Sequence, residues 1–170
     1  MINIVQTSRL NLRKIDTKDA AFILELLNDP AFLHYIGDKK VRDRESAQAY
    51  ILAGPVTSYQ TFGYGLYLVE LLESKVPIGI CGLIKRDFLQ YSDLGFALLP
   101  EYCGKGYAFE SAQATVELAR NHFQMTKIVA FTAIDNLRSI KLLEKLGMSF
   151  DRSINLPDDD EQVNLYSSNL

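Results

Sequence analysis

Two glycines one residue apart, Gly104 and Gly106, lie where the hydrophobic pattern changes from strand-like to helix-like. The preceding stretch, Asp93 to Leu99, is apolar and stopped by Pro100, which is typical of a buried strand. Beyond the glycines, an apolar stripe predicts a long helix: Ala108, Ala112, Val116, Ala119 and Phe123. Glycines let backbone N–H groups approach a ligand closely, and unpaired amides at a helix N-terminus attract anions. The stretch therefore predicts a phosphate-binding loop.

The spacing of these glycines excludes two common phosphate-binding motifs. A P-loop has Lys followed by Ser or Thr after its last glycine, whereas Lys105 lies between the glycines. The dinucleotide fingerprint has a third glycine near position 109, which is Phe109 here. The segment from Cys103 to Ala108 instead resembles the acetyl-CoA loop of the GNAT superfamily of N-acetyltransferases, Gln/Arg-x-x-Gly-x-Gly/Ala, and it matches at Gly106 and Ala108.

The resemblance implies that acetyl-CoA is the cosubstrate and that this loop binds its pyrophosphate. The implied contacts are Cys103, Gly104, Lys105, Gly106, Tyr107 and Ala108. Cys103 replaces the usual Gln or Arg, which removes one side-chain contact but leaves the backbone amides. Lys105 either contacts a phosphate or is a solvated charge at the helix start.

Composition and charge narrow the possible partners. The chain has 170 residues, 48% of them hydrophobic, and a formal net charge of −3, so we expect one domain over residues 1–170. No apolar run approaches the roughly 20 residues of a membrane span and no signal peptide is visible, so we expect a cytoplasmic protein without a membrane partner. Scattered basic residues argue against a nucleic-acid partner. Cys81 and Cys103 lack metal-site spacing, so no metal site or disulfide framework is expected.

Hydrophobic periodicity predicts a mixed α/β fold whose central sheet has about seven mainly antiparallel strands and flanking helices. A helix capped by Asp16 or Thr17 and a second that ends at Gly54-Pro55 precede the central strands. The passage from strand to helix to strand around the glycine loop predicts parallel pairing. Strands are expected at 7–15, 64–72, 77–85, 93–99, 127–133, 148–154 and 162–167, and helices at 17–27, 44–53, 108–123 and 136–146, with a hairpin turn at 157–160.

This order resembles the GNAT fold over nearly the whole chain, and most closely the branch of ribosomal-protein N-terminal (alanine/serine) acetyltransferases. That branch opens with Thr-x-Arg-Leu-x-Leu-Arg, as residues 7–13 do, and carries an acidic residue before Gly-aromatic, as residues 93–96 do. It also has Asn-x-x-Ser and then Lys-Leu-Gly-aromatic, matched at 136–139 and 145–148 with Met148 in place of the aromatic. The resemblance implies that the first helices form one wall of the acceptor site.

The Asn-x-x-Ser motif supplies two candidate residues. Asn136 is an ordinary N-cap residue, and the resemblance implies that its side chain also binds the pantetheine arm. Many relatives place a tyrosine that protonates the departing thiolate at the position of Leu143. The resemblance implies that Ser139 is the acid instead, although a serine in a first helical turn is often only a local backbone partner.

The central strands supply the remaining candidates. Asp93 is the best-placed carboxylate to take a proton from an ammonium if burial raises its pKa, and Glu70 on a neighbouring strand is the alternative. A backbone N–H of Leu98 or Leu99 is expected to bind the carbonyl oxygen, where the family's strand bulges. His34 and His122 are isolated, and no pairing base marks Cys103 as a nucleophile.

These observations predict an N-acetyltransferase that moves the acetyl group of acetyl-CoA to a primary amine by direct attack. The amine could belong to a protein N-terminus or to a small molecule, and the enzyme could be a monomer or a homodimer. The alternative is a non-catalytic module that binds acyl-CoA as a sensor or as part of an assembly.

Overall fold

A single eight-stranded sheet organises the computed structural model, which describes residues 2–157 and 161–170. The strands are β1 (Asn3–Gln6), β2 (Leu10–Lys14), β3 (Leu66–Leu71), β4 (Pro77–Ile84), β5 (Asp93–Leu98), β6 (Lys127–Ala133), β7 (Ser149–Asn155) and β8 (Gln162–Asn169). Their order is β1-β2-β3-β4-β5-β6-β8-β7, and every pair except β5–β6 is antiparallel. The mixed, mainly antiparallel sheet is thus confirmed, with eight strands where about seven were expected.

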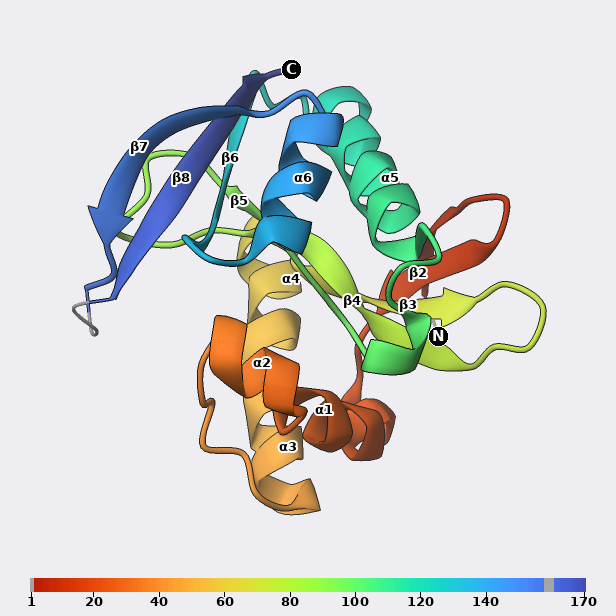
Figure 1. Ribbon diagram of the computed structural model, residues 1–170. Helices are drawn as coiled ribbons and strands as arrows, with labels where there is room; N and C mark the ends of the chain where they lie inside the picture. The colour runs from red at the N-terminus through yellow and green to blue at the C-terminus, as the bar shows by residue number, and fades with distance from the viewer. Residues whose placement is uncertain (1, 158–160) are drawn as a thin grey trace.

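Helices cover both faces of the sheet (Figure 1). The helices are α1 (Ala20–Leu27), α2 (Pro30–Tyr35), α3 (Arg44–Ile51), α4 (Thr57–Phe62), α5 (Tyr107–Asn121) and α6 (Leu137–Lys145). One core packs α5 and α6 against the sheet through residues such as Ala112, Ala119 and Leu143. A second core packs α1, α2 and α3 against the other face, through Ile23, Leu26 and Ile51 among others. Within the described part of the chain, no helix is long and apolar enough to cross a membrane.

Several expected boundaries were wrong for local reasons. The segment Asn28-Asp29-Pro30 follows the end of α1, as expected, but it also begins a helix that was not predicted. The Asp29 side chain accepts hydrogen bonds from the amides of Ala31 and Phe32, and Pro30 is the first residue of α2. The second helix also does not end at Gly54-Pro55, because a π-helical turn over Leu52–Val56 accommodates Pro55 and leads into α4.

The N-terminal strand and the C-terminal hairpin also differ from expectation. The predicted strand 7–15 is shorter, Leu10–Lys14, and an unpredicted strand, β1, precedes it. The hairpin strands β7 and β8 pair as expected, but residues 158–160 of its predicted turn lie outside the described residues. Gly147 has a left-handed conformation, with φ of 83°, and follows the end of α6.

Strands β5 and β6 diverge soon after they begin. They are parallel, as predicted, but the only paired residues are Asp93 and Val129, next to a hydrogen bond of 3.1 Å from the Val129 amide to the Ser92 carbonyl. Beyond Asp93, β5 remains paired with β4 alone, through Leu98. One edge of β5 is therefore open along most of its length, and this edge leads to the glycine loop.

Candidate active site

The loop after β5 presents a run of unpaired backbone amides. A 3₁₀ turn over Pro100–Tyr102 ends with the Cys103 amide donating to the Pro100 carbonyl at 3.1 Å. Gly104 and Gly106 then adopt φ of 75° and 83°, the left-handed region that favours glycine. Among the described residues, none accepts a hydrogen bond from the amides between Gly104 and Phe109. The loop that the sequence singled out thus has free donors at the N-terminus of α5, where an anion is stabilised.

Further unpaired backbone amides lie along the open edge of β5. The Leu99 amide donates to the Ile78 carbonyl on β4 at 2.9 Å. Because antiparallel strands alternate the direction of their hydrogen bonds, the amides of Leu98 and Phe96 point away from β4, toward the side where β6 has diverged. Leu98 can therefore donate to a ligand. Leu99 cannot, so the expectation of a donor at Leu98 or Leu99 is corrected to Leu98.

The strand bulge implied by the resemblance is absent from this part of the sheet. The register between β4 and β5 runs without a shift from Ile84 opposite Asp93 to Gly79 opposite Leu98. The open amide of Leu98 arises from the divergence of β6, since that divergence removes the only strand that could have paired with it.

The N-terminus of α6 carries the Asn-x-x-Ser motif. The Asn136 side chain accepts from the Ser139 amide at 3.2 Å, which confirms Asn136 as an N-cap. Its Nδ2 group and the Ser139 hydroxyl make no hydrogen bond to the residues that the structure describes. Both side chains are half-buried. Leu143, at the position where relatives carry a tyrosine, is fully buried and cannot act as an acid.

Asp93 is buried where β5 and β6 part. Its side chain is only 3% exposed, and its Oδ1 accepts from Arg86 Nε at 2.9 Å. Burial raises the pKa of Asp93 to about 6, although Arg86 acts in the opposite direction. The Arg86 guanidinium also lies 5.0 Å from the centre of the Phe131 ring on β6. A buried carboxylate with this pKa is suited to general-base chemistry near neutral pH.

Glu70 occupies a different environment. Its Oε1 accepts from Asn11 Nδ2 at 2.8 Å, and its Oε2 accepts from Arg13 Nε at 3.0 Å. Arg13 also pairs with Asp19 at 2.8 Å, so Glu70 belongs to a buried network that ties β2 to β3 and to the turn before α1. Both carboxylate oxygens are occupied, which favours Asp93 over Glu70 as the base.

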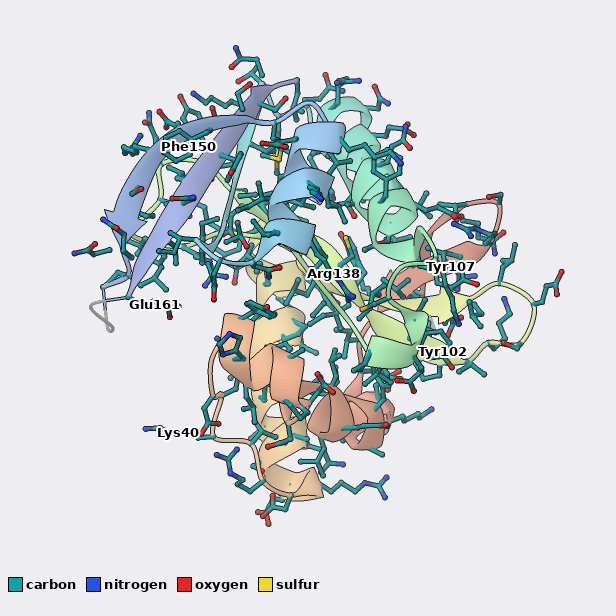
Figure 2. The ribbon with its side chains drawn as sticks, in the orientation of Figure 1. Lys40, Tyr102, Tyr107, Arg138, Phe150 and Glu161 are labelled. Atoms are coloured by element: carbon teal, nitrogen blue, oxygen red, sulfur yellow. The ribbon has the colours of Figure 1, made fainter. Side chains whose placement is uncertain are left out.

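Cys103 is a half-buried thiol beside the loop. Burial raises its pKa, with Arg138 acting in the opposite direction, and its Sγ lies 3.7 Å from the Leu99 carbonyl oxygen. A raised pKa disfavours the thiolate form of Cys103, which is the form that acts as a nucleophile. In Figure 2, Arg138 lies at the start of α6 on the side of the molecule that carries Tyr102 and Tyr107.

Three arginines near the candidate residues were not identified from the sequence. Arg138 lies within the Asn-x-x-Ser motif, and Arg9 within the opening motif, so the resemblance marked both positions without giving either residue a role. Arg86 follows β4 and carries no local signal, because its contact with Asp93 depends on how β4 pairs with β5.

The comparisons with known proteins agree with this geometry. A family model described as an acetyltransferase (GNAT) domain matches residues 9–149. The chain is 27% identical over 144 residues to an uncharacterized N-acetyltransferase, YnaD of Bacillus subtilis (strain 168), with 85% of this chain and 81% of YnaD covered. Its fold is similar to that of an acetyltransferase from Agrobacterium tumefaciens, with a TM-score of 0.84, 22% identity, and 100% and 95% of the two chains covered. It is also similar to RimL, a ribosomal-protein alpha-N-acetyltransferase in complex with coenzyme A, with a TM-score of 0.83, 18% identity, and 99% and 98% covered. The chain belongs to the GNAT family of acetyltransferases.

Proposed function

We propose that this acetyltransferase uses acetyl-CoA as the donor and transfers the acetyl group to a primary amine by direct attack in a ternary complex. The observation that carries the proposal is the run of free amides from Gly104 to Phe109, together with the open edge of β5 that leads to it. The loop suits a diphosphate, and the open edge suits an extended amide-containing arm that pairs with β5 as a strand would. Coenzyme A has both parts in this order.

Each candidate residue then has a step in the reaction. The amine nitrogen attacks the thioester carbonyl carbon, and the Leu98 amide donates to the oxygen as it becomes negative. Asp93 takes the proton that the attacking nitrogen loses, directly or through water. The carbon–sulfur bond breaks, and the Ser139 hydroxyl gives its proton to the departing thiolate. Asn136 holds the pantetheine arm through its free Nδ2 group.

The acceptor amine is proposed only as a class. The helices α1 to α3 lie on the sheet face toward which Asp93 projects, since Asp93 shares its face with Ala97 and Ala97 packs with those helices. We propose that they form one wall of the acceptor site, for either a protein N-terminus, as in RimL, or a small-molecule amine.

A screen of amine classes tests the proposed function. Peptides with free N-termini, polyamines, amino acids and aminoglycosides would each be mixed with enzyme and acetyl-CoA, and released thiol would be measured. We expect one class to accelerate thiol release and to yield an acetylated product by mass spectrometry. Acetyl-CoA binding without acceleration by any amine would instead indicate a non-catalytic module.

A further inference from the structure

The turn between β1 and β2 is fastened to the first turn of α5 by one carboxylate. Glu110 Oε1 accepts from Thr7 Oγ1 at 2.5 Å, from Ser8 Oγ at 3.2 Å and from the Arg9 amide at 3.0 Å. Its Oε2 accepts from Arg9 Nε at 2.6 Å, with Arg9 Nη2 also at 2.6 Å. The residues Thr7, Ser8 and Arg9 are the start of the opening sequence motif, to which the reaction itself gives no role.

Arg9 also contacts the glycine loop directly. Its Nη1 donates to the Lys105 carbonyl at 2.9 Å, and its guanidinium lies 4.5 Å from the centre of the Tyr107 ring. A Cβ added to Gly106 would lie 3.2 Å from Arg9 Nη2. One side chain thus contacts Lys105 and Tyr107 and lies beside Gly106, while it is anchored to the helix that follows.

We infer that Arg9 is a positioning residue for the diphosphate loop, which holds the loop amides in place and neutralises Glu110. The inference rests on the proposed use of acetyl-CoA. All three guanidinium nitrogens already donate, two of them to Glu110 and one to Lys105. These bonds hold the guanidinium against Glu110 and the Lys105 carbonyl, so Arg9 acts on a bound diphosphate through the position of the loop.

The negative charge of Glu110 is the first reason why the loop requires Arg9 beside it. Burial disfavours its carboxylate, but hydrogen bonds from Thr7 and Arg9 outweigh burial and lower the pKa of Glu110, so it is ionised at neutral pH. An ionised, unpaired carboxylate in the first turn of α5 would repel a diphosphate bound at the same helix end. Arg9 cancels that charge where the anion must bind.

The Lys105 carbonyl is the second reason why the loop requires Arg9 beside it. In a loop whose amides face an anion, a carbonyl that turned toward the same space would repel the anion. The hydrogen bond from Arg9 Nη1 holds this carbonyl in place, while the left-handed glycines on either side permit the required backbone path.

Calorimetry with acetyl-CoA tests the inference without an acceptor amine. We expect Arg9→Ala to weaken acetyl-CoA binding by about 10- to 100-fold, the effect of losing a charged hydrogen bond. Binding of acetyl-pantetheine, which lacks the diphosphate and can be followed by NMR titration, should remain at the wild-type level. A merely structural role would weaken both donors alike, and equal losses would overturn the inference.

Two further variants keep the test decisive. Arg152→Ala, which removes a similar exposed charge paired with Asp151 on the distant strand β7, should leave acetyl-CoA affinity unchanged. Adding Glu110→Gln to Arg9→Ala should restore part of the lost affinity, because the unpaired charge is then removed. Wild-type affinity in a folded Arg9→Ala variant would refute the inference alone, whereas a wild-type protein that does not bind acetyl-CoA would refute the proposed function.

Discussion

The buried carboxylate of Asp93 makes the stability of this protein depend on pH in a way that one substitution can isolate. Its pKa is raised from 3.8 to about 6. A raised pKa in the folded state means that folding favours the protonated acid, so the carboxyl contributes most below pH 3.8 and its contribution is lost as pH rises through about 6. This displacement corresponds to about 3 kcal/mol of the free energy of unfolding.

Asp93→Asn removes this titration and keeps an oxygen acceptor for Arg86 Nε. We therefore expect the variant to gain up to about 3 kcal/mol relative to the wild type between acidic and neutral pH. Urea unfolding at a series of pH values measures this gap. If the wild-type and Asp93→Asn curves run parallel from pH 4 to pH 8, the pKa of Asp93 is not raised and the argument fails.

The same carboxyl should govern the acidic side of the pH–rate profile. With Asp93 as base, kcat/KM should fall below about pH 6, where the carboxyl is protonated. This limb should be missing in Asp93→Asn, whose loss of turnover relative to the wild type should be largest above about pH 6, where Asp93 is ionised but the amine is still mainly protonated. Arg86→Gln should move the limb to higher pH, because Arg86 opposes the effect of burial. A limb that persists in Asp93→Asn would assign the titration to another group.

Four further substitutions test the other assignments. Gly106→Glu should abolish acetyl-CoA binding in a folded protein, because it places a charged side chain in a left-handed position against Arg9; unchanged affinity by calorimetry would rule out the loop. Ser139→Ala should lower saturated turnover by on the order of 10²-fold with little change in acetyl-CoA affinity, whereas Asn136→Ala should weaken acetyl-CoA binding and cost about 1 kcal/mol of stability. The reverse pattern would make the serine a cofactor contact. Glu70→Ala should destabilise the fold by about 3 kcal/mol, because Arg13 loses a buried partner, and should leave the pH–rate profile unchanged.

The sequence predicted those parts of the site that local chemistry determines. Gly104 and Gly106 were identifiable because a left-handed backbone next to a strand and a helix favours glycine. Asn136 was identifiable because N-caps have a small set of residue types. Asp29 and Pro30 carry an equally good signal for the start of α2, but the same residue types are also typical of the end of the preceding helix, so the sequence alone does not distinguish the two.

The contacts that were missed depend on the register of the sheet and on long-range packing. The choice between Leu98 and Leu99 as donor depends on which amides of β5 face β4, and this parity is fixed by pairing with Ile78. The ion pairs of Arg86 with Asp93 and of Arg9 with Glu110 join segments that no local pattern connects. Sequence periodicity indicates that a residue lies on a strand. It does not indicate which residue of the neighbouring strand lies opposite it.

The pairing of Asp93 with Arg86 also bears on how an acceptor is chosen. An isolated, ionised and buried carboxylate would attract a cationic acceptor. Asp93 is instead matched by a guanidinium 2.9 Å away, so the pair presents no net charge to an approaching ammonium. Under the proposed mechanism, attraction to Asp93 therefore contributes little to acceptor binding, and the role of Asp93 is confined to the proton. Under the proposed mechanism, selectivity among amines would then come from the remainder of the proposed acceptor wall.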